Sequence, residues 1–159
     1  MKIALMSDSH DNMDALYKAV EYCNREKVDH VLHAGDLVAP FVSRALKKLQ
    51  APLTIVYGNN DGERLGLNAM FKGMIFDPPH EITIDNRKVL MLHAPIVLDD
   101  LRNSGKYDLV LYGHIHEIEI SETNNTLVVN PGEVCGWLTG KSTMAIWDTK
   151  TNKATLVEL

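Results

Sequence analysis

The stretch that decides the fold of this chain reads Leu-Val-Leu-Tyr-Gly-His-Ile-His at residues 109–116. Its first four residues form an apolar run, which indicates a buried strand. The run stops at Gly113 and is followed by His114 and His116, with one residue between them. Side chains at positions i and i+2 of an extended chain point to the same side, so both imidazoles can serve one site. The stretch therefore predicts a buried strand whose carboxyl end carries two metal-binding groups.

Four earlier apolar runs are also followed by polar groups that bind metals. Residues 3–6 precede Asp8 and His10, residues 31–34 precede Asp36, residues 54–57 precede Asn59, and residues 89–92 precede His93. Carboxylate and amide oxygens and imidazole nitrogens suit borderline-hard divalent metals. Ligands of α/β sheets bind outside the carboxyl ends of the strands, so these groups are expected to converge. Their recurrence after five strand-like runs predicts a site for two metal ions that hydrolyses a phosphate ester.

Each of these residues also has a structural interpretation when it is taken alone. A single His93 could be a hydrogen-bonded core histidine, Asn59 a turn residue, and Asp36 a helix cap. Their joint occurrence favours the metal site. Three further histidines belong to no motif and are expected to be structural; these are His30, His33 and His80.

The order of the predicted elements defines the fold class. A helix over about residues 12–27 follows the first strand, and Pro40 can open a second helix before the strand at 53–57. Strand–helix–strand–helix–strand is typical of a parallel sheet with crossover helices. A hairpin at 81–92, a helix at 95–103 and mostly antiparallel strands after His116 complete an α/β (α+β) fold of two packed sheets with outer helices.

The segment from 62 to 79 is the least regular part of the chain. It contains an apolar cluster, made up of Met70, Phe71, Met74, Ile75 and Phe76. A short helix is expected near residues 65–71. The cluster is expected to cap the core, with a subunit contact or a substrate lid as the alternatives.

Composition limits the classes of partner. Lys and Arg total 16 against 21 Asp and Glu, and there is no basic run, which argues against sequence-independent binding of nucleic acid. The two cysteines, Cys23 and Cys135, have no metal or redox spacing and are expected to be reduced thiols of a cytoplasmic protein. No leader pattern or membrane-spanning apolar run is present, so no membrane contact is expected.

The full set of motifs resembles the calcineurin-like metallophosphoesterase superfamily, in particular its small bacterial and archaeal phosphodiesterase branch. The motifs are Asp8-Ser9-His10, Gly35-Asp36, Gly58-Asn59-Asn60-Asp61, His93 and Gly113-His114-Ile115-His116. Their order and spacing match the family pattern, and the match covers nearly the whole chain. The resemblance implies a four-layer αββα sandwich of two mixed β-sheets flanked by helices, formed by residues 1–159 as a single domain.

The resemblance also implies roles for individual residues. One ion would be held by Asp8, His10, Asp36 and His116, and Asp36 would bridge to a second ion held by Asn59, His93 and His114. Manganese is the metal we expect first, and iron, nickel, cobalt and zinc also occur in the family. The implied mechanism is attack on phosphorus by a hydroxide shared between the two ions. Asp61 is expected to orient a ligand histidine.

The sequence departs from the family pattern in three places. Asn60 stands where many members have a histidine that contacts phosphate, and an amide cannot supply a proton to the leaving group. We therefore expect a preference for good leaving groups, such as aryl esters. His93 is followed by Ala94-Pro95 instead of Gly-His, and residues 133–136 read Glu-Val-Cys-Gly instead of a serine-containing loop. Substrate selection is expected to differ at that loop.

The predicted function is that of a metal-dependent phosphodiesterase acting on a small phosphate ester. The alternatives are a non-catalytic protein-interaction scaffold on the same fold, a phosphomonoesterase and a nuclease. A scaffold has no reason to keep seven ligand positions, and a nuclease would be expected to have a basic groove. A homo-oligomer formed through the apolar segment 65–76 is a further expectation.

Overall fold

The computed structural model covers residues 1–159 and contains two β-sheets and four α-helices. The first sheet has the strand order β11-β10-β1-β2-β3-β4, and the second has the order β5-β6-β7-β9-β8. The strands of the first sheet are β1 (Lys2–Met6), β2 (His30–His33), β3 (Leu53–Val56), β4 (Ile75–Phe76), β10 (Thr143–Asp148) and β11 (Lys153–Glu158). Those of the second are β5 (His80–Ile84), β6 (Arg87–Met91), β7 (Leu109–Leu111), β8 (Ile118–Thr123) and β9 (Thr126–Pro131). The helices are α1 (Met13–Arg25), α2 (Ser43–Leu46), α3 (Arg64–Met70) and α4 (Leu98–Ser104).

Both sheets are mixed, as the sequence predicted. Strands β1 to β4 run parallel, and β10 and β11 add antiparallel strands at one edge. In the second sheet, β7 is parallel to both β6 and β9. The pairings after His116 are mostly antiparallel, as predicted, since β8 pairs with β9, β10 with β11 and β10 with β1 in this way. The exception is the parallel pairing of β7 with β9, which the returning strand β8 makes possible.

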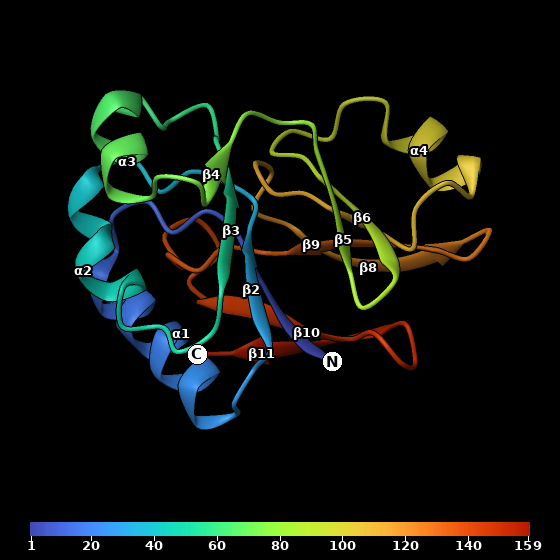
Figure 1. Cartoon of the computed structure of the whole chain (residues 1–159), viewed down its shortest axis with the longest axis horizontal. Helices are drawn as coiled ribbons and strands as arrows, with labels where there is room; N and C mark the ends of the chain where they lie inside the picture. The colour runs from blue at the N-terminus through green and yellow to red at the C-terminus, as the bar shows by residue number, and fades with distance from the viewer.

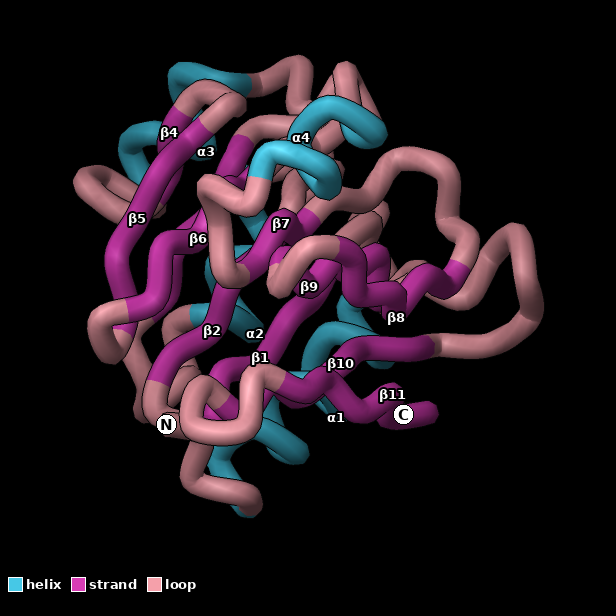
Figure 2. The backbone as a smooth tube through the Cα atoms, turned by 90° about the vertical axis from the view of Figure 1, so that its right-hand side faces the viewer, coloured by secondary structure: helices cyan, strands magenta, loops and turns pink.

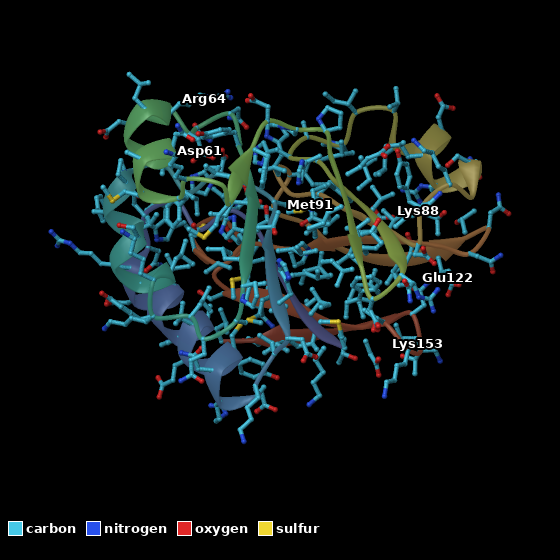
Figure 3. All side chains as sticks on the ribbon, viewed as in Figure 1. Asp61, Arg64, Lys88, Met91, Glu122 and Lys153 are labelled. Atoms are coloured by element: carbon cyan, nitrogen blue, oxygen red, sulfur yellow. The ribbon has the colours of Figure 1, made fainter.

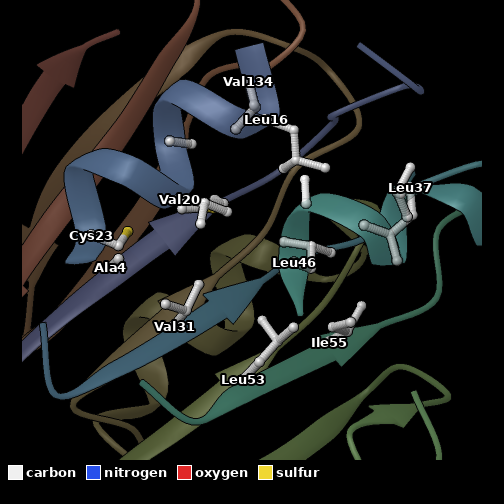
Figure 4. Packing of buried hydrophobic residues seen from close by; sticks show 14 of the residues in the cluster. Ala4, Leu16, Val20, Cys23, Val31, Leu37, Leu46, Leu53, Ile55 and Val134 are labelled. Atoms are coloured by element: carbon white, nitrogen blue, oxygen red, sulfur yellow. The ribbon is translucent and has the colours of Figure 1, made fainter. Parts of the chain in front are cut away.

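The molecule has four layers, and the two helical layers are unequal. Helices α1, α2 and α3 cover the outer face of the first sheet (Figure 1), whereas α4 alone lies over the second (Figure 2). A core of 21 buried residues fills the space beneath α1 to α3 (Figure 4), and α4 itself buries no residue. None of the helices has the length and apolar character needed to cross a membrane.

Strand β1 shows how one short strand serves two cores. Ala4 and Met6 belong to the core under the helices, and Ile3 and Leu5 belong to the core between the two sheets. Alternate side chains of a strand point to opposite faces, so a strand buried on both faces reads as a continuous apolar run. This double burial explains why the apolar runs in the sequence identified the central strands.

The helix boundaries differ from the predictions where the backbone departs from helical geometry. Helix α1 begins after Asn12, whose side chain accepts a hydrogen bond from the backbone N–H of Ala15 at 3.2 Å. Pro40 opens a 3₁₀ turn that leads into α2, which is only one turn long. The predicted helix at 95–103 begins three residues later, at Leu98, because Val97 has a left-handed φ of 49° and cannot lie inside a helix.

The segment 62–79 mainly caps the core. Leu67, Phe71 and Ile75 are buried in the core beneath the helices, whereas Leu65 is 90% exposed and Met70 is 38% exposed. Strand β4 was not predicted, because two residues are too few to show a periodicity. It pairs with the end of β3 and so fixes this segment beside the loop that carries Asn59.

Candidate metal centre

The five predicted strand ends meet at one side of the sandwich. β1, β2 and β3 end there from the first sheet, and β6 and β7 end there from the second. Backbone hydrogen bonds join the loops that follow: Asp8 N–H donates to Gly35 O at 3.0 Å, and Gly113 N–H donates to His93 O at 2.9 Å. These bonds bring residues from distant parts of the chain into a single site.

Four of the predicted ligands form one cluster. Asp8 Oδ1 lies 3.6 Å from His10 Nε2 and 3.5 Å from His116 Nε2, and Asp36 Oδ2 lies 3.4 Å from His10 Nε2. Ligand atoms about 2.1 Å from one ion in octahedral or tetrahedral geometry are about 3.0–3.4 Å apart. Asp8 Oδ1 and His10 Nε2 are buried and have no hydrogen-bond partner. Spacing and unpartnered atoms both fit a divalent metal ion.

A second cluster shares Asp36 with the first. The same oxygen, Asp36 Oδ2, lies 3.4 Å from His93 Nε2. Asn59 Oδ1 lies 2.8 Å from His93 Nε2 and 2.7 Å from His114 Nδ1. All seven predicted ligands are thus brought together, with Asp36 between the two clusters. This arrangement can hold two ions that share a carboxylate.

The backbone at the site is strained. Five of the seven ligand positions have a left-handed φ, namely 54° at Asp8, 39° at His10, 59° at Asp36, 72° at His114 and 60° at His116. Such angles are uncommon for residues other than glycine and cost on the order of 1 kcal/mol or more each. Strain of this kind concentrates at functional sites, which supports a functional role independently of the side chains.

Two glycines let the ligand loops approach closely. A Cβ atom at Gly113 would overlap Ser7 Oγ and Asp8 Oδ2, and one at Gly58 would overlap the carboxylate of Asp36. Ser7 Oγ donates to Asp8 Oδ2 at 2.5 Å, so the two side chains that pack against Gly113 are hydrogen-bonded to each other. The glycines that end the apolar runs are therefore required by packing at the site.

The replacement Gly113→Ala is expected to disrupt the first cluster. The added methyl group must push Asp8 or the loop after β7 aside, and we expect metal affinity to fall by about tenfold or more and stability to fall by about 1–3 kcal/mol. Calorimetric titration with Mn²⁺ and urea unfolding would measure both effects. Gly62→Ala is a suitable control, because a Cβ there meets nothing within 4 Å. Wild-type metal affinity in Gly113→Ala would contradict the expectation.

The charges of the site suit a cation. Burial raises the pKa of Asp36, but the nearby ring of His93 and the hydrogen bonds from Asn60 outweigh burial and hold the pKa well below its usual range. The carboxylates of Asp8 and Asp36, whose oxygens lie 3.6 and 3.4 Å from His10 Nε2, raise the pKa of His10 despite burial. Burial lowers the pKa of His93, but the neighbouring Asp36 more than offsets this and raises it. The site therefore keeps a charged carboxylate that stabilises positive charge on its neighbours.

Residues behind the ligands fix the orientation of two histidine rings. Glu133 is fully buried, and its Oε2 accepts from His116 Nδ1 at 2.6 Å. His93 Nδ1 lies 2.8 Å from the carbonyl oxygen of Ala34. Both contacts leave Nε2 of the ring directed at the site, which is the usual support for a metal-bound histidine. The sequence identified Glu133 only as a departure in its loop and gave it no role.

Asp61 and Asn60 support Asp36 rather than a histidine. The carboxylate of Asp61 accepts hydrogen bonds from the backbone N–H groups of Asp36, Val38 and Gly58, and no hydrogen bond joins it to a histidine. The expectation that Asp61 orients a ligand histidine is therefore wrong. Asn60 donates its backbone N–H and its Nδ2 to the two oxygens of Asp36, at 2.8 and 2.7 Å. Both residues hold the loops around the shared carboxylate.

The remaining candidates each contact a residue that is not one of the seven predicted ligands. Cys135 Sγ donates to Glu133 at 3.0 Å, and burial together with this carboxylate raises the pKa of the thiol to about 12. His30 Nε2 lies 2.9 Å from Thr54 Oγ1, and His80 stacks on Phe76 with ring centroids 4.0 Å apart. His33 is fully buried, and its Nδ1 accepts from the N–H of Gly35 at 3.2 Å.

Acid is expected to destabilise the metal-free protein partly through His33. Burial lowers the pKa of His33 from 6.5 to about 4. Between these values the unfolded chain binds a proton that the folded chain does not, so the free energy of unfolding falls as the pH falls, by on the order of 3 kcal/mol in all. His33→Asn keeps an acceptor for Gly35 but does not titrate. Urea unfolding in chelator at about pH 7 and about pH 4.5 should show a flatter pH dependence for this variant, and an unchanged dependence would contradict the assignment.

The fold and the site together define a class, the α/β sandwiches that hold divalent metal ions at the carboxyl ends of their strands. Residues 1–152 match the family model of the calcineurin-like phosphoesterase superfamily domain, and the chain belongs to this family. It is 43% identical over 156 residues to a phosphodiesterase of Methanocaldococcus jannaschii, covering 94% of each chain. It is 30% identical to a probable metallophosphoesterase of Methanothermobacter thermautotrophicus, covering 83% of this chain and 76% of that one.

Solved structures of other proteins have the same fold as this chain. The structure of an archaeal phosphodiesterase superposes with a TM-score of 0.93 at 41% identity and covers 100% of both chains. Vps29 from Chaetomium thermophilum superposes with a TM-score of 0.73 at 18% identity, covering 100% of this chain and 95% of that one. The first similarity confirms the predicted fold and family, and the second is a similarity of fold alone.

Proposed function

We propose that this chain is a phosphodiesterase whose reaction takes place at two divalent metal ions held by seven residues. The ligands are Asp8, His10, Asp36, Asn59, His93, His114 and His116. The observation that supports the proposal most is the position of Asp36 Oδ2, which lies 3.4 Å from a histidine nitrogen in each cluster. The similarity to an archaeal phosphodiesterase, found both in sequence and among solved structures, supports the diester class. Manganese is the metal we propose, and the free state of both cysteines supports a cytoplasmic location.

Some residues of the chain would hold the metal ions, and others orient the side chains that hold them. When bound, a pair of divalent ions supplies an acidified water nucleophile and the positive charge that stabilises the phosphoryl oxygens. Asp36 keeps its negative charge because Asn60 donates two hydrogen bonds to it and His93 Nε2 lies 3.4 Å from its Oδ2. Glu133 and the Ala34 carbonyl hold His116 and His93 with Nε2 toward the site. Asp61 fixes the backbone on both sides of the shared carboxylate.

Turnover is expected to depend strongly on the leaving group. Asn60 donates its backbone N–H and one N–H of its Nδ2 to Asp36, and an amide carries no proton to release at neutral pH. A group that only donates a hydrogen bond gives up the 10²–10⁴-fold that general acid catalysis typically contributes. Aryl diesters should therefore react much faster than alkyl diesters at a fixed pH. Rates for diesters with a graded series of alcohol pKa values would measure this, and equal rates for aryl and alkyl leaving groups would contradict it.

A direct test of the function uses protein stripped of metal with a chelator. Hydrolysis of bis(4-nitrophenyl) phosphate should be absent in the stripped protein and should return when Mn²⁺ is added. The scaffold alternative predicts no turnover with any divalent metal. The same assay with 4-nitrophenyl phosphate and with single-stranded DNA examines the monoesterase and nuclease alternatives.

The homo-oligomer predicted through residues 65–76 is a separate proposal. Most apolar side chains of this segment pack into the core, so a contact between copies would depend on the exposed Leu65 and Met70. Light scattering of the wild type and of Leu65→Glu would detect such an assembly.

A further inference from the structure

A cavity of about 690 Å³ lies directly beside the second ligand cluster. Asn59 and His93 form part of its wall, so the cavity is continuous with the proposed metal centre. Its floor includes Leu90, Leu92 and Tyr107, which are 3%, 7% and 6% exposed. The segment that leads into α4 forms the opposite rim. A group bonded to a phosphorus atom at the metal centre would therefore have a concave space next to it.

The rim is apolar where a surface would normally be polar. Ile96 and Val97 are 66% and 61% exposed, and both line the cavity together with Leu101 of α4. Exposed apolar side chains around a concave site mark places where a partner or ligand removes them from water. The cavity opens to the metal centre on one side, so the ligand that would cover these residues is part of the substrate.

The few charged groups at the cavity are already paired. Arg64 makes an ion pair with Asp77 at 2.8 Å and lies over the ring of Tyr57 at 4.5 Å from its centroid. It is the first residue of α3 (Figure 3). Glu81 accepts from the hydroxyl of Tyr107 and from Lys106 Nζ. A strongly polar or charged ligand group would have to replace these contacts, whereas an apolar group would leave them intact.

We propose that this cavity binds an uncharged aryl group carried by the phosphodiester substrate, and this proposal rests on the proposed function. The aryl group would lie between the floor formed by Leu90, Leu92 and Tyr107 and the rim formed by Ile96, Val97 and Leu101. Its phosphorus would lie beside Asn59 and His93. The substrate class is then a diester with at least one planar aromatic alcohol. The enzyme would favour such a diester because the cavity binds its aryl group, and also because an aromatic alcohol is a good leaving group.

Two phosphonates test the cavity without any reaction. Phenylphosphonate and methylphosphonate have the same head group and a carbon–phosphorus bond that a phosphodiesterase does not cleave, so their affinities compare an aryl with a methyl group. Their dissociation constants would be measured by calorimetry on the manganese-loaded protein. An aromatic ring exposes on the order of 150 Å² of apolar surface, of which partial burial is sufficient for a tenfold effect. We expect phenylphosphonate to bind at least tenfold more tightly, which corresponds to about 1.4 kcal/mol.

Two variants of the rim make the test specific. Leu101→Trp should fill part of the cavity, and Val97→Asn should make the rim polar at a left-handed position that asparagine tolerates better than valine. Both should bring the ratio of the two affinities close to one. Ile120→Trp, a substitution of an exposed residue on β8 outside the cavity, should leave the ratio unchanged.

The results separate this proposal from the proposed function. A wild-type ratio near one, or a ratio that persists in both rim variants, would overturn the aryl site even if bis(4-nitrophenyl) phosphate is hydrolysed. Absence of metal-dependent hydrolysis, by contrast, would overturn the proposed function. A large ratio that both rim variants abolish supports the aryl site.

Discussion

Asp36→Asn is expected to lose at least about a thousandfold in the rate of metal-dependent phosphodiester hydrolysis. Oδ2 of this carboxylate lies 3.4 Å from His10 Nε2 and 3.4 Å from His93 Nε2, so its loss affects both clusters. Loss of an outer residue that only orients a ligand typically costs about 10–100-fold, and loss of a charged ligand shared by both ions should cost more. The amide has nearly the same shape, so the effect should come from charge and not from packing.

Turnover of bis(4-nitrophenyl) phosphate and the metal content would both be measured on the same sample. Asp36→Asn should bind fewer than two manganese ions per chain and should unfold as cooperatively as the wild type. Asp99→Asn is the matched control, because it makes the same chemical change at a side chain that is 92% exposed on α4. Near wild-type turnover in Asp36→Asn would show that the shared carboxylate is not needed.

Glu133→Gln is expected to weaken metal binding or activity by about 10–100-fold, the range found when a residue behind a metal-bound histidine is lost. Oε2 of Glu133 accepts from His116 Nδ1 and from the thiol of Cys135, and Oε1 accepts from Leu138, Thr139 and the Thr139 hydroxyl. A glutamine places an NH₂ group against at least one of these donors. Burial raises the pKa of Glu133, but hydrogen bonds from Cys135, Thr139 and His116 lower it to about 2, so the wild-type residue is charged at neutral pH.

Two measurements separate orientation of His116 from support of the loop. Calorimetry with Mn²⁺ reports the first, and thermal unfolding in chelator reports the second. If Glu133 only supports residues 133–139, the variant should lose stability and keep its metal affinity, which would contradict the role proposed for it. Glu122→Gln makes the same change at an exposed position of β8, far from the site (Figure 3), and should alter neither measurement.

The sequence was most informative where burial and chemistry follow each other directly along the chain. Strands β1, β2, β3, β6 and β7 are buried on both faces, so they read as apolar runs. The candidate ligands follow within five residues of the end of each strand. The glycines Gly58 and Gly113 end two of these runs because a Cβ would overlap a ligand carboxylate. The convergence of these seven side chains could therefore be predicted from local patterns.

The remaining features depend on contacts between distant residues. Glu133 contacts His116, which lies 17 residues earlier in the chain, and the sequence around either residue gives no sign of this contact. Asp61 contacts backbone N–H groups, which carry no side-chain signature. The cavity beside the second ligand cluster is lined by residues between Tyr57 and Tyr107 that come from the loop after β3, from the second sheet and from α3 and α4. Only the packing of the two sheets brings these residues together.

The central claim is that seven side chains between Asp8 and His116 surround two metal ions that share Asp36. The most direct test is a crystal structure of manganese-loaded protein with anomalous data collected at the manganese edge. The account predicts two anomalous peaks per chain, one on each side of Asp36 Oδ2, about 3.5–4 Å apart as in other two-metal sites. A single peak, or peaks away from Asp36, would contradict it.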